Sequence, residues 1–266
     1  MDSNIASGNI SDASKPNAGR IYDYLLGGNH NFEIDRQAAE QLLKIVPHAK
    51  LLGRTTRWFL AEAVLRLSDK GYDKFIDFAS GLPTEDHIHQ ITPPGTKVIY
   101  SDHDPVTVAY AQEIISGLAD VRYINCDVRT PEKLINLGIV EELFGNERKV
   151  AIGLSGIAWF LPDEALKHTL EVLYNWAAPG SRIFMSEGDV DEKTKLIKDS
   201  QSFYKNMGEP IYQRTKNDII NLLGKWKLED PGFLPLEDWI GMDEIKKRSK
   251  VENWTPVNLI GGFLVK

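Results

Sequence analysis

Cysteine is nearly absent from this sequence, since only Cys126 occurs among 266 residues. One cysteine excludes an intrachain disulfide and makes a cysteine-built metal site improbable, so no metal is expected. Cys126 is instead expected to be a small buried apolar side chain. Long apolar runs are missing too, because no stretch approaches the roughly 20 residues that span a bilayer. With a polar N-terminal segment that lacks an apolar signal core, this predicts a cytoplasmic protein that does not contact membranes.

Positively charged residues are also fewer than negatively charged ones. Lysine and arginine number 31 against 38 aspartates and glutamates, which gives a formal net charge of −7. Proteins that contact many phosphates usually concentrate positive charge on one surface. The nearest candidate, residues 244–250 (EIKKRSK), has mixed charge and is expected to be the solvated face of a helix. Nucleic acid is therefore not expected as a partner.

The chain divides into three parts by its patterning. Residues 1–16 are polar and are expected to be a disordered leader, and residues 17–70 are expected to form a helical cap. Apolar residues recur at helical spacing in 33–46 and 51–68. The remainder, residues 71–266, is expected to be the cofactor-binding core.

Short apolar strands alternate with helices in this core. Strands are expected at 74–78, 96–102, 121–127, 149–160, 181–188 and in two terminal segments, WKLEDPG and NLIGGFLVK. Helices are expected at 105–116, 131–144, 163–178, 191–207 and 215–224. The alternation predicts an α/β fold with a doubly wound, mostly parallel seven-stranded sheet.

Acidic residues stand at the ends of the first three expected strands. They are Asp77, Asp102 and Asp127, and Asp102 lies 21 residues beyond Gly81 in the first loop. Ligands of doubly wound sheets bind outside the carboxyl ends of the strands. Asp102 is expected to accept both hydroxyls of a ribose, and Asp127 to accept a hydrogen bond from an adenine amino group.

The loop after the first strand is poor in glycine. It reads ASGLPTEDHIH, with Gly81 as its one glycine and with Glu85 and Asp86 close behind. A dinucleotide needs a glycine-rich turn to hold its pyrophosphate, and these acids would repel that group. S-adenosyl-L-methionine carries no phosphate, so the loop favours this methyl donor over NAD.

The segment 17–39, NAGRIYDYLLGGNHNFEIDRQAA, resembles the N-terminal signature of the S-adenosyl methyltransferase family that is common in actinobacteria. Residues 77–84, 98–106 and 230–239 are similar to further motifs of that family. The resemblance implies a Rossmann-like class I methyltransferase with an N-terminal helical cap. It also implies S-adenosyl-L-methionine as cofactor and S-adenosyl-L-homocysteine as product.

Two departures from the family pattern bear on the site. Ala79 replaces the usual middle glycine of the first loop and is expected to crowd the cofactor slightly. Residues 155–160, SGIAWF, differ from the usual family sequence after the fourth strand. The acceptor pocket is therefore expected to be particular to this protein.

The resemblance and the strand-end pattern together give the expected site. The residues expected to bind the cofactor are Arg20, Tyr24, Gly28, Asp77, Ala79, Gly81, Asp102, His103, Asp127, Val128 and Ser155. Phe32, Trp159 and Phe160 are expected to line the substrate pocket, and tyrosine rings suit a sulfonium cation. The alternatives are that Tyr22 and Tyr24 pack the cap onto the sheet, and that Trp159 and Phe160 belong to the core.

Methyl transfer depends mainly on holding the acceptor and the methyl group in near-attack geometry, which is worth about 7–11 kcal/mol. An oxygen or nitrogen acceptor can also need a general base, and His30 and His87 (or His89) are the candidates. The expected function is methylation of a small molecule by a monomer or homodimer. A non-catalytic sensor or accessory protein that binds the cofactor is the alternative. The acidic loop disfavours a nicotinamide-dependent oxidoreductase, and the charge balance disfavours nucleic-acid methylation.

Overall fold

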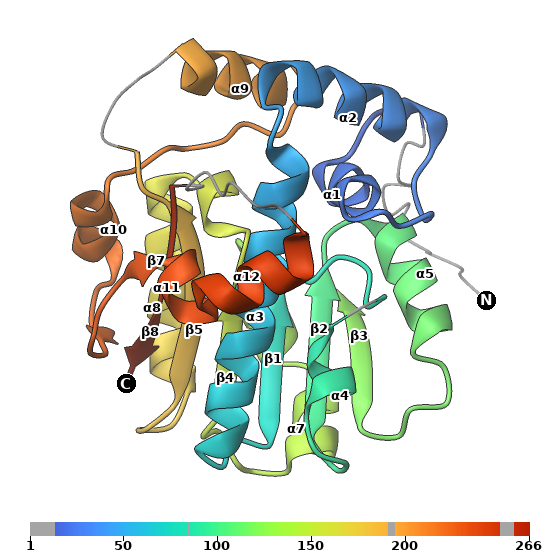
Figure 1. The fold of residues 1–266 in the computed structure, drawn as a ribbon. Coiled ribbons are helices and arrows are strands. Elements are labelled where there is room, and N and C mark those ends of the chain that lie inside the picture. The colour runs from blue at the N-terminus through green and yellow to red at the C-terminus, as the bar shows by residue number, and fades with distance from the viewer. Residues whose placement is uncertain (1–13, 85, 191–194, 251–257) are drawn as a thin grey trace.

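A doubly wound α/β sheet forms the centre of the computed structural model, which describes residues 14–84, 86–190, 195–250 and 258–266 (Figure 1). The described residues form one eight-stranded sheet in the order β3-β2-β1-β4-β5-β8-β6, with β7 paired to β8. Strands β1 to β5 are parallel, and β8 runs antiparallel to β5, β6 and β7. The strands are β1 (Lys74–Phe78), β2 (Lys97–Asp102), β3 (Val121–Asn125), β4 (Ala151–Leu154), β5 (Arg182–Gly188), β6 (Lys227–Leu228), β7 (Leu234–Pro235) and β8 (Leu259–Val265).

The expected fold class is confirmed, and the expected strand count of seven is wrong. The additional strand is the two-residue β7, which pairs with Ile260 and Gly261 of β8. A strand of two residues that contains Pro235 shows no alternation of apolar and polar residues, so periodicity cannot reveal it.

Helices cover both faces of the sheet because its central strands are apolar on both sides. Every residue of β1 and β4 is buried, as a parallel sheet between two helical layers requires. Residues of α6, α7, α8 and α10 share one buried cluster with these strands, and residues of α3, α4, α5 and α11 share the other. The helices are α1 (Ala18–Leu26), α2 (Glu33–Ile45), α3 (Ala49–Asp69), α4 (Ile88–Ile91), α5 (Pro105–Ile114), α6 (Glu132–Ile135), α7 (Gly138–Phe144), α8 (Asp163–Trp176), α9 (Lys195–Asn206), α10 (Lys216–Leu222), α11 (Leu236–Ile240) and α12 (Met242–Ser249), with a 3-10 turn η1 (Ala158–Phe160).

A helical cap lies over the carboxyl ends of the parallel strands. Figure 1 shows α1, α2 and α9 together above the sheet, although α9 lies far from the other two in the sequence. Apolar residues of α1 and α2 form a separate buried cluster, against which Phe203, Tyr204 and Met207 pack. The cap therefore includes a helix from outside the expected segment 17–70.

Helix α3 belongs to the cap and to the core at once. Its second half, including Phe59, Val64 and Leu67, packs in the same cluster as the strands.

Residues 1–13 of the expected leader and residues 191–194 of the expected helix 191–207 lie outside the described residues. Among the helices of the described part, none is both long and apolar enough to cross a bilayer.

Candidate functional site

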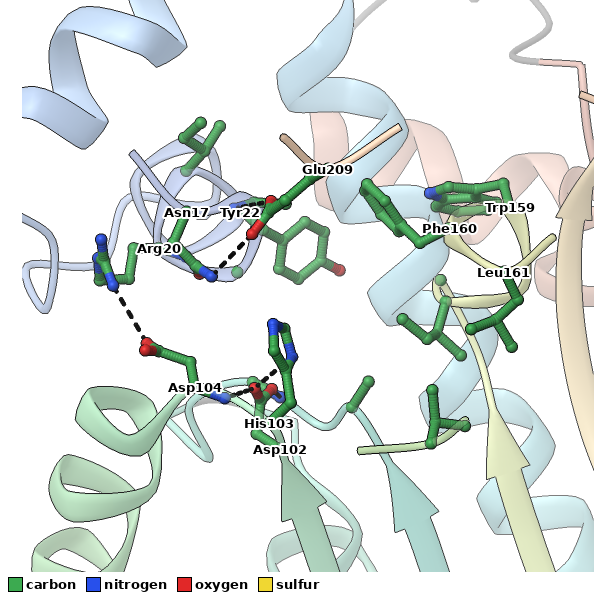
Figure 2. Close-up of a pocket in the computed structure, with 18 of the residues that line it drawn as sticks. Asn17, Arg20, Tyr22, Asp102, His103, Asp104, Trp159, Phe160, Leu161 and Glu209 are labelled. Carbon is green, nitrogen blue, oxygen red and sulfur yellow. Dashed lines mark hydrogen bonds and ion pairs between the residues drawn. The ribbon is translucent and has the colours of Figure 1, made fainter. Parts of the chain in front are cut away.

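A cavity of about 580 Å³ lies between the strand ends and the cap (Figure 2). Small-molecule sites usually enclose about 300–1,000 Å³, so the cavity has the size of such a site. The sequence-predicted residues that line it are Arg20, Asp77, Ala79, Gly81, Asp102, His103, Asp127, Val128, Ser155, Trp159 and Phe160.

Asp102 is buried at the end of β2, and backbone amides fix its carboxylate. Oδ2 accepts a hydrogen bond from the amide of Gly81 at 3.3 Å, and Oδ1 accepts one from the amide of Asp104 at 2.9 Å. Gly81 can turn toward Asp102 because its φ is +63°, a conformation that glycine adopts readily. The carboxylate is thus held in one orientation at the cavity wall.

His103 follows Asp102 and carries positive charge at neutral pH. Its Nδ1 lies 3.4 Å from Oδ1 of Asp102. The hydrogen bond to Asp102 raises the pKa of His103 to about 9, against the opposing effect of burial, and the charge of Asp127 adds to the rise. At neutral pH the ring is a proton donor on the cavity wall.

Asp127 lies just after β3 and is held by its neighbour Arg129. The guanidinium Nε of Arg129 lies 2.9 Å from both carboxylate oxygens, and the backbone amide of Arg129 donates to Oδ1 at 2.8 Å. Burial opposes ionisation of Asp127, but the hydrogen bonds and charge of Arg129 outweigh it and hold its pKa below the ordinary value. The carboxylate is ionised, and any ligand amine would share it with Arg129.

Two buried groups of opposite charge, Asp77 of β1 and Arg57 of α3, lie on the cavity wall. Within the described residues, Oδ2 of Asp77 and Nε of Arg57 are both buried without a hydrogen-bond partner. Burial raises the pKa of Asp77 to about 6, although the charge of Arg57 lowers it. Gly153 makes room for Asp77, because a Cβ there would lie 2.0 Å from Oδ1. Unsatisfied buried polar atoms of this kind are rare and mark a place where a ligand can bind.

His87 is buried away from the cavity lining and supports Arg57. Its Nε2 lies 2.8 Å from Nη1 of Arg57 and 2.6 Å from the carbonyl oxygen of Leu82. Burial lowers the pKa of His87 well below its ordinary value, so the ring is neutral. His89 contacts the Tyr100 hydroxyl through Nδ1 at 2.9 Å and does not line the cavity either.

Four other sequence-predicted residues lie in the cap, outside the cavity lining. Tyr24 donates to Glu40 at 2.8 Å, and the ring of His30 packs edge-on against Tyr110. Gly28 lies against Asp23, where a Cβ would come within 2.1 Å of Oδ1. The ring of Phe32 lies 5.2 Å from the Arg20 guanidinium carbon. The structure therefore brings neither His30 nor His87, the two candidate bases, to the cavity.

Two parts of the cap that are far apart in the sequence are joined at the edge of the cavity, as Figure 2 shows. Glu209, in the segment after α9, accepts hydrogen bonds from the amide of Ala18 at 2.7 Å and from Nδ2 of Asn17 at 3.1 Å. Glu209, Asn17 and Arg57 are not among the site residues predicted from the sequence. A polar N-cap such as Asn17 is a local signal that could have been found, whereas Glu209 lies in a connecting segment without one.

Cys126 also lines the cavity but is not a nucleophile. Burial raises the pKa of its thiol to about 11, so the thiolate does not form at neutral pH. This agrees with the expectation of a small buried side chain.

The comparisons with known proteins cover nearly the whole chain. A family model described as S-adenosyl methyltransferase matches residues 4–263. A crystal structure of a candidate methyltransferase from Thermobifida fusca superposes with a TM-score of 0.85 at 27% identity, over 98% of this chain and 99% of that one. A DUF574 family protein from Streptomyces avermitilis superposes with a TM-score of 0.86 at 22% identity, over 96% and 99%.

More distant structures share the fold alone. Magnesium protoporphyrin IX methyltransferase from Synechocystis, solved with bound S-adenosylmethionine, gives a TM-score of 0.51 at 13% identity, over 99% of this chain and 100% of that one. No curated protein matches the sequence. Since the family model covers nearly the whole chain, and the fold is that of class I methyltransferases, the chain belongs to the S-adenosyl methyltransferase family.

Proposed function

We propose that this protein binds S-adenosyl-L-methionine in the cavity and transfers its methyl group to an oxygen or nitrogen atom of a small molecule. The observation that carries the proposal is the carboxylate of Asp102, which the amides of Gly81 and Asp104 fix in one orientation on the cavity wall. A carboxylate held in this way can accept both hydroxyls of a ribose.

The residues around Asp102 fit the rest of the cofactor. Asp127 and the backbone of Val128 lie beside Asp102 on the wall and would receive the adenine. The methionine end carries an ammonium and a carboxylate. Asp77 and Arg57 offer the opposite charges, and each has a buried polar atom without a partner in the described residues.

When bound, the cofactor would supply a methyl group already activated by a sulfonium. The work of the protein would then be to position the acceptor and exclude water. The cap residues Asn17 and Ala18, fastened to Glu209, would close the cavity over both ligands. A cavity of about 580 Å³ beneath the cap supports a small acceptor over a macromolecular one.

Glu209 replaces the histidines as the candidate general base. His103 lines the cavity, but its pKa of about 9 leaves it protonated at neutral pH. The Glu209 carboxylate also lines the cavity, and burial raises its pKa toward the range in which a carboxylate accepts protons effectively.

A non-catalytic protein that binds the same cofactor is the second candidate. Ala79 lines the cavity with a φ of +53° at a position where the family usually has glycine, and Arg129 already occupies Asp127. Both features could tune binding at the expense of turnover. This candidate predicts tight cofactor binding and no product with any acceptor.

Calorimetric titration with S-adenosyl-L-methionine, S-adenosyl-L-homocysteine and NAD tests the cofactor. We expect both adenosyl ligands to bind, NAD not to bind, and Asp102→Ala to abolish binding. Asp69→Ala, which removes an exposed carboxylate at the end of α3, is the matched control and should bind as the wild type does. Equal binding by Asp102→Ala would refute the proposed site. Release of S-adenosyl-L-homocysteine during a screen of phenols and amines then separates an enzyme from a sensor.

A further inference from the structure

Aromatic side chains from three separate segments gather on one part of the cavity wall. Trp159 and Phe160 come from η1, Tyr204 comes from α9, and Tyr212 comes from the segment before α10; all four line the cavity. The Phe160 ring lies 5.5 Å from Tyr204 at an interplanar angle of 80°, and 6.3 Å from Trp159 at 50°. These are the offset and edge-to-face arrangements that aromatic rings prefer.

Three polar atoms in this aromatic wall are available for hydrogen bonds to a ligand. Hydroxyl and indole groups of partly buried tyrosine and tryptophan usually find a hydrogen-bond partner. In the described part of the chain, however, the Tyr204 hydroxyl, the Tyr212 hydroxyl and the Trp159 indole nitrogen make no hydrogen bond to protein. None of the three is among the fully buried unsatisfied atoms, so each is accessible to a ligand or to water. Burial raises the pKa of Tyr204, so its hydroxyl stays protonated and can donate. The wall thus offers flat apolar faces together with hydrogen-bond donors.

Arg214 holds the wall in a fixed shape. Its guanidinium donates to the carbonyl oxygen of Ala158 at 3.1 Å and to that of Leu161 at 2.5 Å, one residue on either side of the pair Trp159–Phe160. The amide of Tyr212 donates to the Trp159 carbonyl oxygen at 2.6 Å. A binding wall fixed in advance loses little entropy when a ligand arrives.

Two carboxylates elsewhere in the cavity lining already have partners within the protein. Arg129 pairs with Asp127, and the Glu209 carboxylate receives hydrogen bonds from Asn17 and Ala18. A cationic acceptor seated among these rings would have to share a carboxylate with Arg129 or with Asn17 and Ala18 as its lasting counter-charge. An uncharged ring needs only the aromatic faces and the donors.

We infer that the acceptor subsite takes a flat, uncharged aromatic ring carrying a hydroxyl or amino group. This inference rests on the proposed function and specifies its substrate class. The ring packs against Trp159, Phe160 and Tyr204, while the hydroxyls of Tyr204 and Tyr212 orient its polar substituent.

Titration of the wild-type protein, saturated with S-adenosyl-L-homocysteine, with 2-naphthol and with its saturated counterpart 2-decalol tests the inference. A flat aromatic ring stacks on aromatic side chains and a saturated ring does not, so we expect 2-naphthol to bind about tenfold or more tightly than 2-decalol. Tetramethylammonium tests the cationic alternative and should not bind. Equal affinity for the two alcohols, tight binding of the cation, or no binding of 2-naphthol would each overturn the inference.

Trp159→Leu locates the binding. It should weaken 2-naphthol by about tenfold while leaving the affinity for S-adenosyl-L-homocysteine unchanged. Trp176→Leu is the matched control, since Trp176 lies on α8 outside the cavity lining and should change neither affinity. Unchanged 2-naphthol binding by Trp159→Leu would overturn the inference that the ring binds against this wall. Failure of S-adenosyl-L-homocysteine itself to bind would overturn the proposed function and this inference with it, whereas failure of 2-naphthol alone overturns only the inference.

Discussion

Arg20 of the cap forms a buried ion pair with Asp104, the residue that caps helix α5. Nη1 of Arg20 lies 3.1 Å from Oδ2 of Asp104, and Nε lies 2.8 Å from Oδ2 of Asp35 in α2. The amide of Asp104 in turn donates to Asp102. One guanidinium therefore links two cap helices to the loop that presents Asp102 to the cavity.

Arg20→Met is expected to destabilise the protein and weaken cofactor binding together. Removing one partner of a buried ion pair typically costs about 3–5 kcal/mol, because the remaining carboxylates lose their counter-charge. Urea unfolding measures the first effect, and titration with S-adenosyl-L-homocysteine measures the second. Arg36→Met breaks an exposed pair with Glu33 and should cost about 1 kcal/mol or less. Similar losses in the two variants would contradict the proposed role of Arg20.

Cofactor affinity is expected to depend on pH through Asp77. Burial raises its pKa to about 6, so the carboxyl is protonated below that pH and ionised above it. If Asp77 receives the ammonium of the cofactor, the affinity for S-adenosyl-L-homocysteine should rise between pH 5 and 7 and then level off. Calorimetry across this range measures the profile, and Asp77→Asn should bind weakly without the rise. A rise that persists in Asp77→Asn would assign the profile to another group.

The raised pKa of Asp77 also affects the stability of the unliganded protein. Stability should fall as the pH rises, whereas cofactor affinity should increase. The unfolded chain gives up the Asp77 proton near the ordinary value of 3.8, while the folded chain retains it to about 6. Folding therefore becomes less favourable as the pH rises between these values. The loss should be absent in Asp77→Asn, which denaturant titrations at pH 4 and pH 7 can check.

The strand-end residues could be predicted from the sequence because their positions follow from local patterns. Parallel strands present their carboxyl ends at one edge of a sheet, so Asp77, Asp102 and Asp127 had to lie near one another once the strands were recognised. Trp159 and Phe160 also line the cavity, but they lie in the turn η1, because β4 ends at Leu154 and the expected strand 149–160 is too long.

The cap contacts could not be predicted in this way. Glu209 contacts Ala18 across 191 residues of sequence, and nothing local to either residue indicates the other. The sequence places His87 close to the loop after the first strand, but it does not show where the side chain points. His87 follows the first loop as expected, yet its ring turns to Arg57 and Leu82 inside the protein.

His103 should titrate far above an ordinary histidine. Hydrogen bonding to Asp102 raises its pKa to about 9, and NMR of the ring protons measures this directly. Asp102→Asn should return the midpoint toward 6.5, because the charge that stabilises the imidazolium is gone. A raised pKa means that the pair stabilises the fold fully below about pH 6.5 and that this contribution is lost as the pH rises through about 9. An unchanged midpoint in Asp102→Asn would assign the shift to Asp127 or Glu209 instead.

Ala79→Gly is expected to stabilise the protein and to strengthen cofactor binding. Ala79 has a φ of +53°, and the left-handed region costs a residue with a Cβ about 1–2 kcal/mol. Glycine also increases the conformational entropy of the unfolded chain, at a cost of about 0.4–1 kcal/mol, which leaves a net gain of about 0–1.6 kcal/mol. Because Ala79 lines the cavity, loss of its methyl group also gives the cofactor more room.

Ala111→Gly is the matched control for this substitution. Ala111 is buried inside α5, where glycine should cost about 1 kcal/mol without touching the cavity. Thermal unfolding and titration with S-adenosyl-L-homocysteine compare the two variants. Opposite signs of the stability change would show that Ala79 is strained at a position suited to glycine. Equal destabilisation would instead mean that the Ala79 methyl group packs well enough to offset its backbone conformation, so that the departure from the family pattern carries no energetic penalty.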